Sequence, residues 1–108
     1  MAQVSRRYIK PQVGAKIQNL LIDCIRRCND QKTTVSFIES LLTNTEKTML
    51  AKRVAIALMI LKGVDYEKID NTLMVSKATI WRVKIWLDDK GSGFRSLLNE
   101  VLKHDSEK

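Results

Sequence analysis

The segment from Asp65 to Lys84 constrains the fold most strongly, because its apolar residues have the spacing of two short helices joined by a tight turn. These apolar residues are Ile69, Leu73, Val75, Ile80 and Val83. The pair before the turn is four residues apart and the pair after it is three apart, so each pair lies on one face of a helix. Val75 then fills the turn. The spacing predicts a helix-turn-helix over about residues 65–87.

The second of these helices begins with side chains that suit a reader of DNA. Ser76 precedes it, and a serine there can accept hydrogen bonds from the open N–H groups of the first turn. Polar and basic residues then fall on or beside the outward face, where a helix in the major groove meets bases and phosphates. These residues are Lys77, Ala78, Thr79, Trp81 and Arg82. An ordinary helical hairpin is the alternative, but it has no need of this polar set.

Two positions depart from the usual helix-turn-helix pattern. Asp70 stands where alanine is common, and Met74 stands where glycine adopts a left-handed backbone. A residue with a Cβ atom in that conformation costs about 1 kcal/mol. We therefore expect a looser turn.

Length and charge agree with a small nucleic-acid-binding protein. The chain of 108 residues is 44% hydrophobic, which predicts one domain, and its net charge of +7 favours polyanionic partners. Residues 1–12 are polar and basic, and no run of about 18 apolar residues occurs. We expect a cytoplasmic protein that is neither membrane-spanning nor secreted.

Metal binding and catalysis are not expected. Cys24 and Cys28 are the only cysteines and lie in an apolar helical stripe, so core filling explains them better than zinc binding, which would need two more ligands. The single histidine, His104, falls near the end of the chain. Asp88 and Asp89 are adjacent and do not share a helix face, so they form no acid–base pair. We predict no catalytic residue, no metal site, no cofactor and no enzymatic activity.

Six helices and no strand are expected along the chain. A flexible basic arm, residues 1–12, is separated by Pro11 from a first helix over about Val13 to Asn29. Lys32 to Thr34 form a polar break before a short second helix that contains Phe37, Ile38, Leu41 and Leu42. Thr43 and Glu46 form a capping box that opens the third helix.

The third helix, which Gly63 terminates, contains the most apolar stretch of the chain, Val54 to Leu61. A helix that is apolar all round must be covered on all sides, which one chain of this length can hardly do, so we expect a dimer core. Gly91-Ser92-Gly93 breaks the chain before the last helix. The single domain is predicted to span residues 13–104, followed by a polar tail, residues 105–108.

The order of particular motifs resembles the Trp repressor superfamily from about Phe37 to Lys103. The motifs are Leu-Leu-Thr-Asn-Thr-Glu-Lys, Lys-Arg-Val, Leu-Lys-Gly, Ala-Thr-Ile-x-Arg and Leu-Leu-Asn-Glu-Val-Leu. The run Ser-x-Ala-Thr-Ile-x-Arg-Val-Lys at 76–84 is similar to the YerC/YecD group of that superfamily. The resemblance implies an intertwined all-α homodimer whose two reading heads contact half-sites about 34 to 36 Å apart, as in helix-turn-helix dimers such as Trp repressor.

The resemblance also implies roles on DNA. The residues expected to read bases are Lys77, Ala78, Thr79 and Trp81. Trp81 has two further alternatives: it stacks on DNA sugars, or it folds back on Ile85 and shields the dimer flank. Apart from the resemblance, a DNA-binding function makes a further set of residues candidates for contacts to the DNA backbone: Arg6, Arg7, Lys10, Tyr66, Lys68, Ser76 and Lys84.

Tryptophan is not expected to be the effector. Arg53 and Arg82 match the two arginines that hold the indole in tryptophan-sensing members of the superfamily. Val83 stands where those members have glycine, and Trp86 where they have serine, so the space is filled and a polar contact is lost. We expect a vestigial pocket, and the effector, if one exists, is unknown.

Two functions remain open at this point. The first is a dimeric, sequence-specific DNA-binding transcription regulator, which we expect to be a repressor. The second is a helical scaffold or accessory protein that binds a protein partner or acts in a DNA-rearranging complex. A salt-dependent shift of duplex DNA would separate them.

Overall fold

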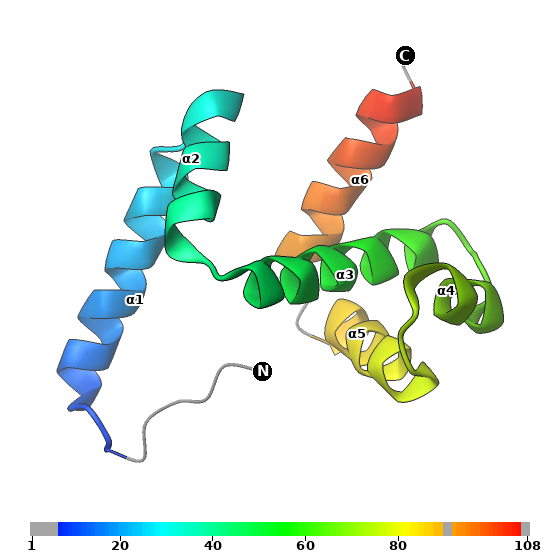
Figure 1. The fold of residues 1–108 in the computed structure, drawn as a ribbon, viewed down its shortest axis with the longest axis horizontal. Coiled ribbons are helices and arrows are strands. Elements are labelled where there is room, and N and C mark those ends of the chain that lie inside the picture. The colour runs from blue at the N-terminus through cyan, green and yellow to red at the C-terminus, as the bar shows by residue number, and fades with distance from the viewer. Residues whose placement is uncertain (1–6, 90–91, 107–108) are drawn as a thin grey trace. The chain divides into compact units, whose positions relative to one another are not determined.

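The computed structural model describes residues 7–89 and 92–106. Within these ranges the chain forms six α-helices and no strand, which confirms the all-α expectation. The helices are α1 (Pro11–Arg26), α2 (Gln31–Leu41), α3 (Asn44–Leu61), α4 (Tyr66–Leu73), α5 (Lys77–Asp89) and α6 (Ser92–Ser106) (Figure 1). The chain divides into two compact units, Met1–Thr48 and Met49–Lys108. The single domain over 13–104 therefore stays a prediction.

The first helix begins at Pro11 and ends at Arg26, so the predicted bounds of Val13 and Asn29 are wrong. Proline suits the first position of a helix, because its fixed φ is already helical and its missing N–H would be unpaired there in any case. Pro11 therefore starts the helix instead of separating it from the arm. The predicted arm accordingly ends at Lys10, and residues 1–6 lie outside the described residues.

The polar break predicted at Lys32 to Thr34 is also wrong, because α2 already begins at Gln31. Asp30 is the N-cap, and its carboxylate accepts a hydrogen bond of 2.8 Å from the backbone N–H of Thr33. The hydroxyl of Thr34 donates to the carbonyl of Asp30 at 2.7 Å. The polar residues of the predicted break therefore form the first turn of a helix, for which an aspartate N-cap is a favourable start.

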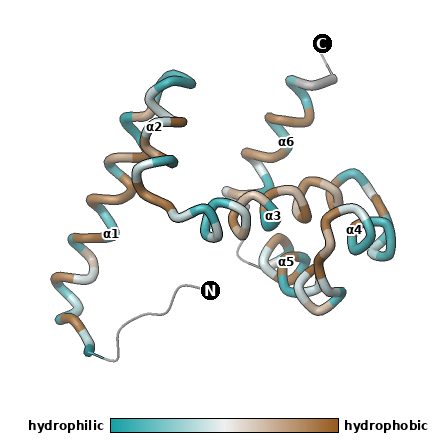
Figure 2. The backbone as a smooth tube through the Cα atoms, in the orientation of Figure 1, coloured by the Kyte–Doolittle hydropathy of each residue, from teal (hydrophilic) through white to brown (hydrophobic). Residues whose placement is uncertain are grey.

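The apolar stripe of α1 is left uncovered in the single chain. No residue of α1 or α2 is buried, and the side chain of Leu20 is 62% exposed. Brown, hydrophobic stretches recur along both helices in Figure 2. Cys24 and Cys28, which we expected in the core, are free thiols of intermediate burial.

The ends of α3 follow the predicted signals. The backbone N–H of Thr43 donates to Glu46 Oε1 at 2.8 Å, and the N–H of Glu46 donates to Thr43 Oγ1 at 3.1 Å, which confirms the capping box. At the other end Gly63 has a φ of 78°, and its N–H bonds to the carbonyl of Ile60. The N–H of Val64 bonds to the carbonyl of Met59. These paired bonds satisfy the last carbonyls of the helix, and glycine adopts the required conformation without strain.

The core belongs to the Met49–Lys108 unit. Its buried residues are Ile56 and Ala57 of α3, Ile69 of α4, Ile80, Val83 and Leu87 of α5, and Leu98 of α6. Helix α5 contacts both α4 and α6. Every described helix of the unit thus contributes to one cluster, which packs against one face of α5.

The last helix differs from the prediction at both ends. Ser92 and Gly93 belong to α6, so they do not break the chain as expected, and Gly91 lies outside the described residues. The helix continues to Ser106, so residues 105–106 of the predicted polar tail are helical. Among the described residues, no helix has the length and apolar character needed to cross a membrane.

Candidate nucleic-acid interface

Met74 makes the tight turn between α4 and α5. It adopts φ 56° and ψ 53°, the left-handed conformation, and its N–H bonds to the carbonyl of Asp70 at 2.8 Å. The side chain is 78% exposed, so the conformation is accommodated without a clash in the core. The expectation of a looser turn is therefore wrong, because methionine takes the bend that glycine usually makes.

Ser76 caps α5 as predicted. Its Oγ accepts a hydrogen bond of 3.1 Å from the backbone N–H of Thr79 and lies 3.0 Å from Thr79 Oγ1. Its carbonyl accepts from the N–H of Ile80. The cap fixes the first turn of the recognition helix, and the two hydroxyl groups hold each other in place.

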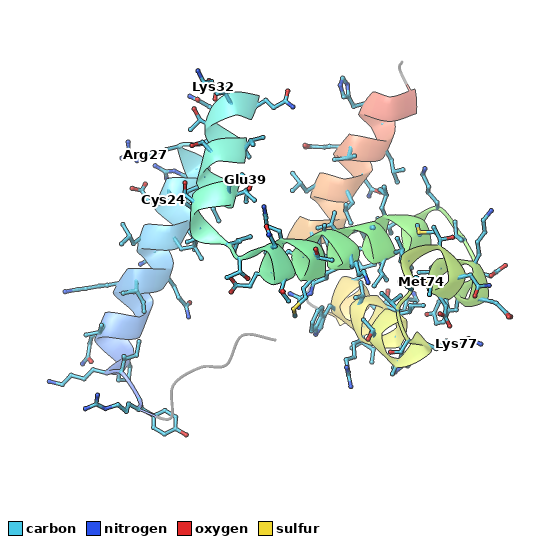
Figure 3. All side chains as sticks on the ribbon, viewed as in Figure 1. Cys24, Arg27, Lys32, Glu39, Met74 and Lys77 are labelled. Atoms are coloured by element: carbon cyan, nitrogen blue, oxygen red, sulfur yellow. The ribbon has the colours of Figure 1, made fainter. Side chains whose placement is uncertain are left out.

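The four predicted base-reading residues lie on the first two turns of α5. Lys77, Ala78 and Trp81 are exposed, whereas Thr79 is half-buried beside the cap. Figure 3 shows Lys77 extending outward from the start of the helix. Trp81 is 56% exposed and therefore accessible to a partner. Behind them, Ile80 and Val83 are buried, so the helix has one face in the core and one face in solvent.

An open depression of about 530 Å³ lies between the first turns of α4 and α5. It is lined by Asp65, Tyr66, Glu67, Lys68, Asn71 and Lys77. Three of the predicted DNA contacts, Tyr66, Lys68 and Lys77, are thereby brought together from two helices. The carboxylate of Asp65 caps α4 by accepting from the N–H of Lys68 at 2.8 Å.

Glu67 and Asn71 also line this depression and are not among the predicted site residues. They are one helical turn apart, so the i,i+4 spacing on the face that carries Lys68 was the available signal. Asn71 offers both a donor and an acceptor to base edges or phosphates. Glu67 brings negative charge next to Lys77 and Lys68, so the depression is not a simple anion site.

Lys84 forms an ion pair within the chain that was not predicted. Its Nζ lies 2.9 Å from Asp88 Oδ2, and Arg95 of α6 lies 3.1 Å from Asp88 Oδ1. Asp88 therefore holds two cations and joins the end of α5 to α6. The i,i+4 spacing of Lys84 and Asp88 was visible in the sequence, but there it was indistinguishable from a solvated helix end.

The DNA contacts predicted for the N-terminal arm do not belong to the unit that contains the helix-turn-helix. Arg7 and Lys10 are exposed and belong to Met1–Thr48, where Lys10 directly precedes α1. Arg6 lies outside the described residues.

The four residues of the expected vestigial pocket have different surroundings. The guanidinium carbon of Arg53, on α3, lies 4.8 Å from the centroid of the Trp86 ring on α5. Val83 is buried in the core, whereas Arg82 is exposed. Among the described residues, no buried side-chain nitrogen or oxygen lacks a hydrogen-bond partner, and no cluster of His, Cys, Asp or Glu is placed to hold a metal ion.

Comparison with known proteins identifies the family. The family model described as Trp repressor protein matches residues 16–102, which is most of the chain. No curated protein and no solved structure matches the chain significantly. The match confirms the resemblance at the level of the superfamily, and the YerC/YecD group stays a prediction. Its range contains the helix-turn-helix and most of α1 and α6. The chain therefore belongs to the Trp repressor family of DNA-binding regulators.

Proposed function

We propose that the chain is a homodimeric, sequence-specific transcription repressor whose DNA binding does not depend on free tryptophan. The observation that carries this proposal is the reading head formed by α4 and α5. Its turn is left-handed at Met74, its second helix is capped by Ser76, and Lys77 stands exposed at the start of that helix. Exposed donors on the first turns of a rigidly anchored helix are what major-groove recognition requires.

The proposed contacts divide into two classes. Base edges are read by Lys77, Ala78, Thr79 and Trp81. The sugar–phosphate backbone is contacted by Arg6, Arg7, Lys10, Tyr66, Lys68, Ser76 and Lys84. Phosphate contacts position the protein without reading sequence, so the first class sets the preferred operator and the second sets much of the affinity.

The homodimer is supported by the exposed apolar side chains outside the reading head. Leu20 of α1 and Leu97 of α6 are each 62% exposed. Large apolar side chains left in water on a monomer are unfavourable, whereas a second copy of the chain would bury them.

Selection of bound duplexes from a random pool tests the function. The expected result is a palindrome with two half-sites about one helical turn apart, which a dimer with two reading heads would select. If about six to ten phosphates are neutralised, log K should fall with log salt at a slope of about −5 to −9. Failure to enrich any sequence would favour the scaffold alternative.

Effector independence is supported by Val83 and Trp86. A buried valine and a tryptophan stacked on Arg53 leave the expected vestigial pocket filled by the protein's own side chains. Overpacking and a lost polar contact together would weaken tryptophan binding by roughly two to three decades. Calorimetry with millimolar L-tryptophan should give no saturable heat. A dissociation constant of tens of micromolar would show that the pocket is functional.

A further inference from the structure

Helix α5 carries two apolar stripes on opposite faces. The first stripe lies in the core and consists of the buried residues Ile80, Val83 and Leu87. The second, which we call the outer stripe, consists of the exposed residues Ala78, Trp81 and Ile85. Both stripes advance in steps of three and four residues, so each follows one face of the helix. Every member of the core stripe comes two positions after a member of the outer stripe, which is about 200° around the helix axis.

The outer stripe is a hydrophobic surface that the chain itself does not cover. The side chain of Trp81 is 56% exposed and that of Ile85 is 43% exposed. A helix that packs on a core by one face normally has polar residues on the opposite face. Apolar side chains that line up there contribute little to the fold, and they indicate a surface that contacts a partner.

The charges beside the outer stripe favour DNA as this partner. Lys77 and Arg82 lie on either side of the stripe, and both are exposed. Lys77 extends outward from the start of the helix (Figure 3). Asp88, near the other end of α5, is paired with Lys84 and Arg95. An apolar surface between two cations fits a groove whose floor of base edges lies between two rows of phosphates.

Thymine supplies the apolar group on the floor of the major groove. Its C5 methyl group is the hydrophobic feature that base edges present there, and apolar side chains recognise it by direct contact. The outer stripe from Ala78 to Ile85 is about 10 Å long at about 1.5 Å per residue. This length corresponds to roughly three base pairs at about 3.4 Å each.

We propose that the outer stripe recognises thymine methyl groups, so that Trp81 and Ile85 select T·A base pairs by apolar contact. Ile85 thereby becomes a further specificity-determining residue, and Trp81 supplies the largest contact area. Lys77 keeps its role as a hydrogen-bond donor to a neighbouring base. The inference rests on the proposed function, because it names the bases that the recognition helix prefers.

Replacement of thymine by uracil deletes the methyl group and leaves base pairing unchanged. In the duplex that the protein selects, each thymine is replaced in turn by uracil, and the affinity of the unmodified protein is measured. At about one to three positions of each half-site we expect a loss of about fourfold, which corresponds to about 0.8 kcal/mol for one buried methyl group. Uracil outside the half-sites should have no effect.

Truncation of the outer stripe identifies the side chains that contact the methyl groups. Trp81→Ala should weaken the selected complex by about tenfold and remove the uracil effect at one sensitive position, because a contact that is already lost cannot be lost again. Ile85→Ala should remove the effect at a different position. Met74→Ala is the matched control, since it truncates an exposed apolar side chain of the helix-turn-helix that lies outside α5. This variant should respond to uracil as the unmodified protein does.

The outcomes separate the inference from the function on which it rests. If the unmodified protein selects no duplex, the proposed function fails and the inference fails with it. If it selects a duplex in which no thymine is sensitive to uracil, the inference alone is overturned. Uracil effects that persist unchanged in both Trp81→Ala and Ile85→Ala would also overturn it, because the methyl groups would then contact other residues. Circular dichroism checks the folding of each variant, and Ile85→Ala decides the test should Trp81→Ala fail to fold.

Discussion

Met74 shows how a single residue stores strain in the reading head. Its left-handed backbone, φ 56° and ψ 53°, places the Cβ atom too close to the following carbonyl oxygen, at a cost of roughly 1–2 kcal/mol. Its largely exposed side chain contributes little to the core. The strained turn is needed because it places both Ile69 of α4 and Ile80 of α5 in the core. Burial of these two residues offsets the strain.

Replacement of Met74 by glycine should therefore stabilise the protein. We expect Met74→Gly to raise the free energy of unfolding by about 0.5–1 kcal/mol relative to Met74→Ala, after the greater entropy of an unfolded glycine is counted. Met74→Ala is the matched control, because it also removes the side chain but keeps the strained Cβ. Denaturant unfolding measures the difference. Equal stability of the two variants would show that the turn is unstrained.

Lys77 and Lys84 belong to the same helix but should affect DNA binding differently. Lys77→Ala should cost about 1–3 kcal/mol on the preferred duplex and relax base preference, because a donor to a base edge is lost. Lys84→Ala should weaken binding to all duplexes and flatten the salt slope by about one. Titrations on preferred and random duplexes at several salt concentrations measure both effects. The assignment is wrong if the two variants change every duplex equally.

Asp88 limits the charge that Lys84 offers to DNA. Its carboxylate neutralises part of both Lys84 and Arg95. Such exposed pairs are worth at most about 1 kcal/mol, so Asp88→Asn should cost little stability and should strengthen binding to any duplex by up to about fivefold. The control is Glu100→Gln, which removes the same charge from an exposed position of α6. An equal gain from both variants would indicate net charge alone.

Two helix caps make the stability of the fold depend on pH. Hydrogen bonds from Thr33, more from its side chain than from its backbone N–H, hold the pKa of Asp30 below its ordinary value of 3.8. Thr43, chiefly through its backbone N–H, holds the pKa of Glu46 below its ordinary value of 4.5. A carboxylate with a lowered pKa in the folded state stabilises the fold above its unfolded pKa. That contribution is lost as the pH falls toward the folded pKa.

We therefore expect helicity and stability to decrease below about pH 4.5, as these two carboxylates take up protons. Asn and Gln keep a side-chain acceptor but do not titrate, so the double variant Asp30→Asn/Glu46→Gln should lose less stability between pH 6 and pH 3. Urea unfolding followed by circular dichroism at each pH measures this. If the double variant and the unmodified protein have the same pH profile, the caps do not cause the dependence.

Local hydrogen bonding explains which elements could be predicted from the sequence. The capping box at Thr43 and Glu46 and the cap at Ser76 join residues three apart in the chain. Both caps can therefore be predicted from the sequence alone. The start of α2 was missed because the first turn of an exposed helix is as polar as a loop. The stack of Arg53 on Trp86 depends on how α5 meets α3 in the core, and residue spacing alone does not give that geometry.

At the scale of the whole molecule, burial is distributed unevenly. All described buried residues belong to Met49–Lys108, whereas α1 and α2 bury none. The stripe of α1 is predicted to lie in the core, but the single chain leaves it exposed, and the sequence does not say what covers it. Hydrophobic residues that recur at helical spacing along an entire helix are stabilising only when they are removed from water. A second copy of the chain is the partner that we propose.

Folding and association should consequently be one event. A protein whose folded state is a dimer gains about 2.7 kcal/mol of apparent stability for each hundredfold increase in concentration, so its Tm should rise by several degrees between micromolar and hundred-micromolar samples. Leu20→Asp should lower the Tm and steepen its dependence on concentration, because it places a charge in the proposed interface. Gln18→Asp adds the same charge at an exposed position on a different face of α1 and should have little effect. Sedimentation equilibrium gives the mass at each concentration. A monomeric mass together with a Tm that does not change with concentration would mean that the apolar face of α1 is covered by something other than a second copy.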